Sequence, residues 1–287
     1  MTANAAQRDG LISSFTLMVT IDDGDMMATI KWGKPRRWGG WLLVLLVTRI
    51  LAGAADLSPE GLDRRFGEAC QAARERFRTN TNDVTAAWEL GRACFDWAEL
   101  ARTDARRAAL GRDGVAACRH ALGLDPQCAP AQYYLGLNLG QVARTKLLGA
   151  LKLVGEMEAA WLAAIALDPK FNYAGPHRSL GRLYLEAPGW PVSLGDRAKA
   201  RQHLEQAVKL APDYPDNQLA WIEALLKWGE RKTVRARLEP VGRILDTARQ
   251  KYSGERWALD WQEWDLLWRS IQARANPPKA ESPRQKE

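Results

Sequence analysis

The sequence has little of the chemistry that enzymes and metal sites require. Its 287 residues include three histidines and four cysteines, and no two cysteines are spaced as a CxxC pair. It contains no catalytic triad, phosphate-binding loop or metal-binding helix motif. We therefore predict that the chain is not an enzyme, has no catalytic residues, and binds neither a metal nor a cofactor. A catalytic role would require His177 and Glu186 to meet a second carboxylate in one pocket.

Basic blocks with interleaved aromatic residues, the pattern of proteins that bind single-stranded nucleic acids, are also missing. The net charge is +7, from 41 basic and 34 acidic residues. A modest positive excess spread over long helices is typical of a solvated surface. We therefore predict no nucleic-acid partner.

No apolar run reaches the roughly 20 residues that a membrane-spanning helix needs. The apolar stretch from Trp38 to Val47 is short, four basic residues precede it between positions 31 and 37, and the small residues 52–55 follow it. This order is typical of a secretory signal peptide. We expect residues 26–54 to be that signal peptide, cleaved after Ala54, and the mature chain to be periplasmic or secreted without a transmembrane span. An uncleaved anchor is the alternative.

Residues 1–25 have no place in such a signal. We expect translation to start at Met26 or Met27, which would make residues 1–25 a non-native upstream extension. At the other end, residues 275–287 are rich in Pro, Lys and Glu, and we expect a disordered tail there. The repeat domain then covers residues 57–274.

Two interleaved signatures recur along this domain. Leu-Gly pairs end at Gly91, Gly136 and Gly181, 45 residues apart, and Ala-rich stretches end at Pro126, Pro169 and Pro212, 43 residues apart. A Leu-Gly pair in an apolar stretch of helical spacing predicts a first helix, and each Ala-rich stretch predicts a second helix that ends at its proline. Because neither helix can bury its face alone, successive units must stack.

These residues resemble the tetratricopeptide repeat (TPR), whose second-helix pattern is matched by Ala200, Leu204, Ala207 and Pro212. The resemblance implies an all-α, right-handed solenoid of helix pairs. From the glycine to the proline the family spacing is about 24 residues, whereas here it is 35, 33 and 31 residues. We therefore expect lengthened loops within the repeats, all on one edge of the solenoid.

Within this class, four segments are similar to the T-component family of tripartite (TRAP) transporters: 173–184, 187–190, 195–201 and 212–215. The resemblance implies an envelope protein that works beside a periplasmic solute-binding protein and has a ligand-sized pore or pocket. The Cys that anchors some family members by lipid has no counterpart near the expected cleavage site.

The expected helices begin at Ser58-Pro59, a helix cap followed by a first-turn proline. Helix pairs follow at about 84–125, 129–168 and 174–211, with a less regular pair at 216–236. A last helix near 255–273 carries four tryptophans at helical spacing, Trp257, Trp261, Trp264 and Trp268. We interpret it as a C-terminal capping helix, since a terminal repeat needs an apolar inner face. A partner-binding face is the alternative.

First helices line the concave surface of TPR arrays, and the family's groove positions predict the candidate binding residues. Aromatic, arginine and carboxylate side chains together suit a protein or peptide partner, or a small anionic or apolar ligand. A merely solvated surface is the alternative, and for the two arginines the alternative is salt bridges to Glu186 and to neighbouring units. The predicted groove residues are Trp88, Arg92, Tyr133, Gln141, Arg178, Arg182, Trp190, Glu223 and Lys227.

Four cysteines allow three pairings in an oxidising compartment. Cys94 and Cys118 fall on the paired helices of one unit and are the candidate disulfide. The alternative is that they are small core residues.

Two functions from different classes fit these observations. One is an exported, non-enzymatic scaffold that holds a protein or peptide in its groove. The other is a solute-handling accessory similar to the TRAP T-component, which the apolar insertion 147–154 favours because its leucines need a burial partner. A periplasmic protein that binds a small ligand or peptide and has no part in transport is the further alternative.

Overall fold

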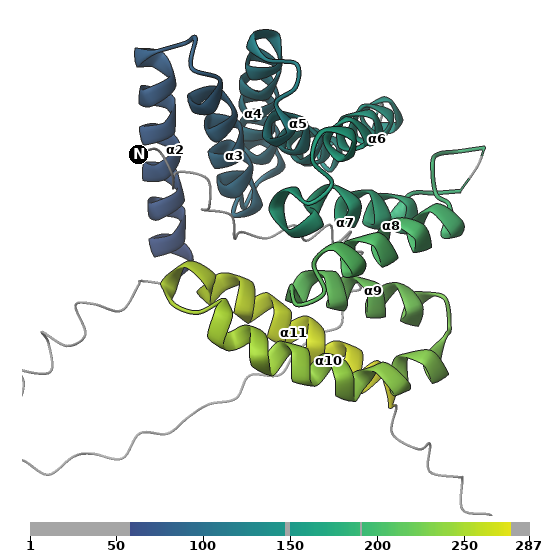
Figure 1. The fold of residues 1–287 in the computed structure, drawn as a ribbon. Coiled ribbons are helices and arrows are strands. Elements are labelled where there is room, and N and C mark those ends of the chain that lie inside the picture. The colour runs from purple at the N-terminus through teal and green to yellow at the C-terminus, as the bar shows by residue number, and fades with distance from the viewer. Residues whose placement is uncertain (1–57, 147–149, 190, 277–287) are drawn as a thin grey trace, which may run out of the picture.

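The described residues form an array of ten α-helices (Figure 1). The structure is a computed structural model, and it describes residues 58–146, 150–189 and 191–276. Within these ranges no helix is both long and apolar enough to cross a membrane. The helices are α2 (Pro59–Thr79), α3 (Val84–Glu99), α4 (Asp104–Leu124), α5 (Ala129–Ala143), α6 (Ala150–Leu167), α7 (Phe171–Glu186), α8 (Arg197–Leu210), α9 (Pro215–Lys227), α10 (Arg231–Lys251) and α11 (Ala258–Ala275), with the short 3₁₀ helix η2 (Glu255–Trp257) before α11.

The expected extension (1–25) and signal peptide (26–54) lie outside the described residues, as does the expected tail from residue 277 onward. The array itself ends one residue later than predicted. Ala275 is buried, and its carbonyl oxygen accepts a hydrogen bond from Arg235 Nε at 3.1 Å.

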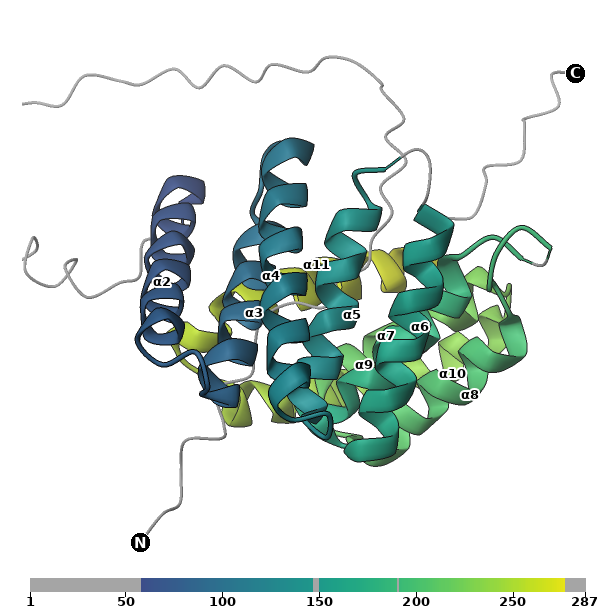
Figure 2. The same cartoon turned by 90° about the horizontal axis from the view of Figure 1, so that it is seen from above.

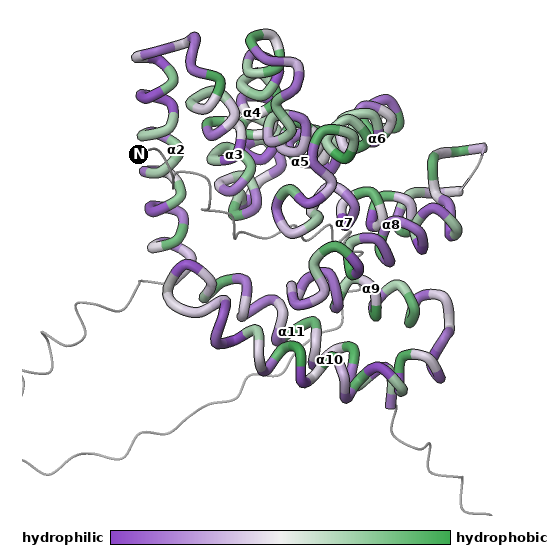
Figure 3. Tube along the Cα trace, viewed as in Figure 1, coloured by the Kyte–Doolittle hydropathy of each residue, from purple (hydrophilic) through white to green (hydrophobic). Residues whose placement is uncertain are grey.

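Short polar side chains start several helices, and at Ser58 the sequence predicts it. The Ser58 hydroxyl accepts a hydrogen bond from the Gly61 amide at 3.0 Å, and Pro59 occupies the first turn of α2. Asp83 caps α3 and Asp196 caps α8 in the same way, each through two backbone amides. Figure 3 colours each residue by its hydropathy. Apolar and polar residues alternate along most helices, and α6 is apolar over much of its length.

The helices pack as antiparallel pairs, α3 with α4, α5 with α6, and α7 with α8. The backbones of the first helices, α3, α5, α7 and α9, also approach one another, whereas those of α4, α6 and α8 stay apart. The array therefore curves with the first helices on its inner side (Figure 2).

The glycine of each Leu-Gly pair permits close packing within a unit. A Cβ atom added at Gly136 would lie 2.4 Å from the Trp161 indole nitrogen, and one at Gly181 would lie 2.5 Å from Leu204 Cγ. Such distances are far below van der Waals contact, so only glycine fits at these two positions. The all-α array of stacked helix pairs is thus confirmed.

The extra length of the units is distributed differently from the prediction. In the first unit the connection between helices spans only 100–103, because Thr103 caps α4 at once and the added residues extend that helix. The third unit does have a long connection, 187–196. Lengthened loops are therefore not a feature of every repeat.

The start of α7 departs from regular helix geometry. Asn172, Tyr173 and Ala174 have φ angles of 48°, 55° and 60°, a left-handed conformation that non-glycine residues rarely adopt. The Tyr173 carbonyl is held by hydrogen bonds from Asn217 Nδ2 at 3.0 Å and Arg178 Nη1 at 3.3 Å. Tertiary contacts therefore impose this turn.

The C-terminal hairpin of α10 and α11 packs beside α9. Trp257 and Trp264 are buried in its core, and the Trp261 indole donates to the Tyr252 carbonyl at 2.6 Å. Leu266, on the opposite face of α11, is 63% exposed. The tryptophan stripe therefore faces the array, as expected for a capping helix. Helix α10 runs past the predicted end near 236 and continues through Pro240 to Lys251.

Candidate functional site

The predicted concave groove is largely occupied by its own side chains. Its aromatic residues belong to a ring cluster: the half-buried Trp88 stacks on Tyr134 with ring centroids 6.0 Å apart, and Tyr133 is fully buried against Tyr134 and Phe171. Tyr133 is therefore a core residue. Arg92 is half-buried and pairs with Asp96 on its own helix at 3.5 Å.

The predicted polar residue of the second unit also serves packing. Gln141 is buried, donates to the Glu99 carboxylate and accepts a hydrogen bond from Arg107 at 3.2 Å. Burial raises the pKa of Glu99, and the nearby Arg144 guanidinium opposes that rise. These contacts join α3, α4 and α5 and leave no free binding group at Gln141.

Arg178 and Arg182 are the leading ligand-binding candidates from the sequence, and the structure places both in the protein interior. Arg178 is 1% exposed, and its Nε lies 2.7 Å from Asp216 Oδ2. Arg182 Nη2 lies 2.6 Å from Asp216 Oδ1. Both arginines therefore tie α7 to α9, which is the salt-bridge alternative with Asp216 as the partner in place of Glu186.

Of the remaining predicted groove residues, Lys227 is exposed and forms an ion pair with Glu186, and Glu223 is half-buried on α9. Trp190 lies outside the described residues. The inner surface is thus crossed by contacts between successive units.

The histidines do not assemble the catalytic cluster considered above. His177 Nδ1 lies 3.0 Å from His203 Nδ1, while Glu186 pairs with Lys227. Burial, the neighbouring His177 and the Lys199 ammonium lower the pKa of His203 to about 4, and burial lowers that of His177. Within the described residues, no three His, Cys, Asp or Glu side chains are grouped to hold a metal ion.

The predicted Cys94–Cys118 disulfide is corrected by the structure. All four cysteines are free, and the sulfur nearest to Cys94 belongs to Cys70, at 3.8 Å. The Cys118 sulfur instead packs against Gly91, where an added Cβ would lie 2.3 Å from it. Cys118 is therefore a core residue at the contact between α3 and α4.

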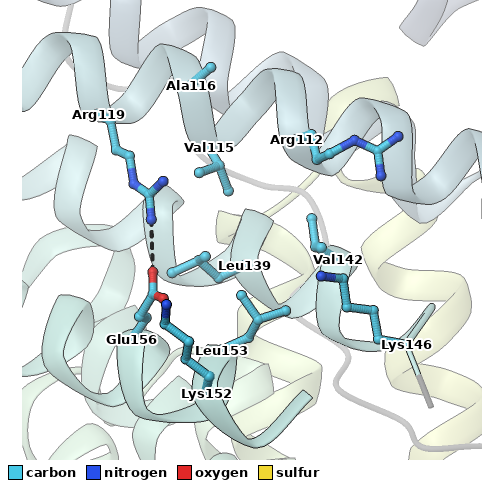
Figure 4. Close-up of a pocket in the computed structure, with 10 residues that line it drawn as sticks. All are labelled: Arg112, Val115, Ala116, Arg119, Leu139, Val142, Lys146, Lys152, Leu153 and Glu156. Carbon is cyan, nitrogen blue, oxygen red and sulfur yellow. Dashed lines mark hydrogen bonds and ion pairs between the residues drawn. The ribbon is translucent and has the colours of Figure 1, made fainter. Parts of the chain in front are cut away.

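An open cleft lies on the outer side of the array between α4 and α6, with α5 beneath it (Figure 4). Its volume is about 580 Å³. The floor and inner walls are apolar, and charged side chains line the rim. The apolar lining comprises Val115, Ala116, Leu139, Val142 and Leu153, and the charged lining comprises Arg112, Arg119, Lys146, Lys152 and Glu156. We name these ten residues the outer cleft.

The charge of the outer cleft is unbalanced. Arg119 pairs with Glu156 at 2.7 Å across the opening (Figure 4). Arg112, Lys146 and Lys152 are exposed and have no ion-pair partner in the part of the chain that the structure describes. Three cations without an ion-pair partner among the described residues therefore surround an apolar floor.

The equivalent gap in the next unit is filled. Tyr184 stands 45 residues after Leu139, and its hydroxyl donates to Glu158 on α6. Lys199 on α8 lies 3.8 Å from the same carboxylate and 5.0 Å from the Tyr184 ring centroid. The gap between α6 and α8 is thus closed by a large aromatic ring and an ion pair, whereas the gap between α4 and α6 has Leu139 at its floor.

Reasoning from the sequence missed the outer cleft, because the family's groove positions point to the inner surface. The 45-residue repeat period aligns Leu139 with Tyr184, so one unit has a leucine where the next has a larger, polar-tipped tyrosine. This difference between units is the sequence feature that indicates the cleft.

Comparisons with known proteins bear on the fold. No protein-family model matches the chain, and no curated protein matches its sequence. Among solved structures, the chain is similar to TTC0263, a thermophilic TPR protein in Thermus thermophilus, with a TM-score of 0.51 and 17% identity over 80% of this chain and 96% of that one. MamA matches with a TM-score of 0.46 and 19% identity over 64% of this chain and 91% of that one. The likeness to TTC0263 shows that the chain has the fold of a TPR array.

Proposed function

We propose that this chain is an exported, non-enzymatic scaffold protein whose outer cleft binds an acidic, apolar-faced segment of a partner protein. The observation that supports this most is the outer cleft itself, which combines an apolar floor with three cations that have no ion-pair partner among the described residues. Apolar surface that is left open between packed helices is a common site of protein interaction.

The chemistry of the outer cleft defines the partner. The apolar side chains of a partner would pack on the half-buried Leu153 and on the edges of Val115, Leu139 and Val142, which are themselves largely buried. Burial of apolar area is the main source of affinity in such grooves. Lys146 and Lys152 stand on the rim, where opposite charges speed association and select against wrong partners. A helix with leucines on one face and carboxylates beside them meets both requirements.

The inner surface supports the same choice of site. Several of its predicted binding residues are buried or paired within the protein, as Arg178 and Arg182 are with Asp216. A ligand at these arginines would have to displace an ion pair that is shielded from water, which costs several kcal/mol. The outer cleft has no such competition.

Peptide binding tests this proposal. The probe is a fluorescein-labelled synthetic helix of about three turns with leucines at i, i+3, i+4 and i+7 and glutamates elsewhere. We expect saturable binding by fluorescence anisotropy, and no binding of the same peptide with lysine in place of every glutamate. Lys146→Glu combined with Lys152→Glu should weaken binding by at least about tenfold, or roughly 1.4 kcal/mol.

A charge-matched control separates the site from the overall charge. Lys209→Glu combined with Lys232→Glu changes the net charge equally at exposed positions of α8 and α10, and should leave the affinity unchanged. Equal loss in both double variants, or binding of the lysine peptide, would show that the outer cleft is not a site for acidic segments.

A solute-handling role, as the resemblance to the TRAP T-component implies, is the second candidate. The volume of the outer cleft, about 580 Å³, is within the usual range of small-ligand pockets. Decanoate, an anionic amphiphile, is the probe for this role. Tight binding of decanoate without binding of the acidic peptide would favour solute handling over the scaffold.

Export is part of the proposal and rests on the basic, apolar and small residues between positions 31 and 55. Protein recovered from the envelope fraction of a bacterial host should begin at Ala55 when its N-terminus is sequenced. Protein that stays in the cytoplasm with residues 31–54 attached would contradict export, and with it the transport role.

A further inference from the structure

We infer that Cys70 and Cys94 form a dithiol that closes to a disulfide and fastens α2 to the rest of the array. The two sulfur atoms are 3.8 Å apart, and both side chains are 0% exposed. Thiols in van der Waals contact need only small rotations about their side-chain bonds to reach bonding distance. This inference is independent of the proposed function.

The place of the pair gives the bond a structural role. Helix α2 stands at the end of the described array, and among the described helices its backbone approaches only α3 (Figures 1 and 2). Beneath it Leu90 and Ala117 join the two cysteines in a small core cluster, and Leu62 and Phe66 of α2 are also buried. Because a terminal helix packs against fewer neighbours than an internal one, it is the first part of an array to detach.

Ion pairs give α2 limited further support. Arg74 reaches Asp113 on α4 at 2.8 Å, and Arg106 on α4 reaches Asp63 at 2.7 Å. All four side chains are more than a third exposed, and exposed ion pairs contribute little to stability. A covalent link between Cys70 and Cys94 would therefore change the behaviour of α2 most.

The surroundings distinguish the two thiols. The hydrogen bond between the two thiols lowers the pKa of Cys70, and the Arg74 guanidinium acts in the same direction against the effect of burial. The same hydrogen bond raises the pKa of Cys94, and burial raises it further. In the docked array Cys70 is thus the more acidic of the two thiols.

Closure proceeds by exchange with a disulfide-containing oxidant such as oxidised glutathione. One of the two cysteine thiolates attacks one sulfur of the oxidant, forms a mixed disulfide and releases one glutathione thiolate. The other cysteine thiolate then attacks the cysteine sulfur of the mixed disulfide and releases the second glutathione thiolate. Two electrons pass to the oxidant, and the two protons lost by the cysteines end on the two glutathione thiols.

Burial decides when this exchange occurs. No oxidant reaches sulfur atoms that are 0% exposed, so the reaction takes place while α2 is detached, during folding or local opening. Once α2 docks, the same burial protects the product from reductants. The other two cysteines stay reduced on this view, because Cys118 is buried against Gly91 and Cys128 belongs to a separate core cluster.

Thiol counting on the full chain tests the inference. The denatured, reduced protein is refolded in a glutathione redox buffer, denatured again without reductant, and titrated with Ellman's reagent. We expect two reactive thiols in place of four, and a peptide map that joins the peptides of Cys70 and Cys94. Cys118→Ala with Cys128→Ala should retain the cross-link, and Cys94→Ala should abolish it.

Thermal unfolding of the oxidised and reduced proteins tests whether the disulfide stabilises the folded array. Closing a loop of 24 residues should raise the midpoint of thermal unfolding by about 5 °C or more relative to the reduced protein. Four free thiols after refolding, or a map that joins Cys94 to Cys118, would overturn the inference. Neither result would bear on peptide binding, which the outer cleft governs.

Discussion

A single buried side chain, Arg178, joins α7 to the start of α9 through three neighbouring residues. Its guanidinium contacts Asp216 at 2.7 Å and donates to Asn217 Oδ1 at 2.8 Å, and it lies 5.1 Å from the centroid of the Tyr214 ring. Burial opposes its charge, yet the Asp216 carboxylate holds the pKa of Arg178 above its ordinary value. The charge is therefore kept in the interior by its partners.

Removal of this charge should destabilise the fold strongly. Arg178→Gln leaves the Asp216 carboxylate buried with one partner fewer, and breaking a buried ion pair costs about 3–5 kcal/mol. Lys227→Gln, which breaks the half-exposed pair with Glu186, should cost less than about 1 kcal/mol. Urea unfolding followed by circular dichroism measures both. Equal, small losses would mean that the interior ion pair adds nothing to stability.

The sequence predicts which helix face carries Arg178 and leaves its role open between ligand binding and a salt bridge. Helical spacing shows that Arg178 and Arg182 share one face of a first helix. It does not show that Asp216, 34 residues beyond Arg182, lies on the next first helix in a position to contact both arginines. A charged side chain in a repeat can face solvent, bind a ligand or pair with a residue of the next repeat. Only the packing of the array determines which of these occurs.

Between neighbouring helices, the contact of His177 on α7 with His203 on α8 should make stability depend on pH. The pKa of His203 is lowered to about 4 in the folded state by burial, His177 and Lys199, against about 6.5 in an unfolded chain. The folded protein therefore binds fewer protons, so its free energy of unfolding is highest above pH 6.5 and falls as the pH drops toward 4.

We expect a loss on the order of 1–2 kcal/mol between pH 6.5 and 4 from this pair, after discounting for its partial exposure. His203→Gln should flatten that part of the profile, while His120→Gln, which removes an exposed histidine on α4, should keep the slope. Urea unfolding at a series of pH values gives the comparison. An unchanged slope in His203→Gln would show that the pair is not responsible.

The helices themselves were predictable to differing degrees. Ser58 and Pro59 mark the start of α2 locally, and the structure confirms it. The left-handed turn at Asn172–Ala174 contains no glycine that would predict it, because Asn217 on α9 and Arg178 later in α7 hold its backbone. Local signals thus predict helix caps, and they fail where distant residues impose the backbone conformation.

For the array as a whole, the repeat period predicts the stacking of helix pairs, and the fold follows from it. The binding surface does not follow in the same way. The outer cleft lies where one unit has Leu139 and the next has Tyr184, and three of the cations around it lack ion-pair partners among the described residues. Such a surface depends on differences between units, whereas the repeat pattern reports what the units share.

The affinity of the Leu139→Tyr variant for the acidic peptide tests the outer cleft most directly. The substitution places at the cleft floor the side chain that fills the equivalent gap between α6 and α8. We predict that peptide binding falls by at least about tenfold, or roughly 1.4 kcal/mol, with the helix content of the protein unchanged by circular dichroism. Full affinity in a folded Leu139→Tyr protein would contradict the proposal, because the peptide would then bind elsewhere on the array.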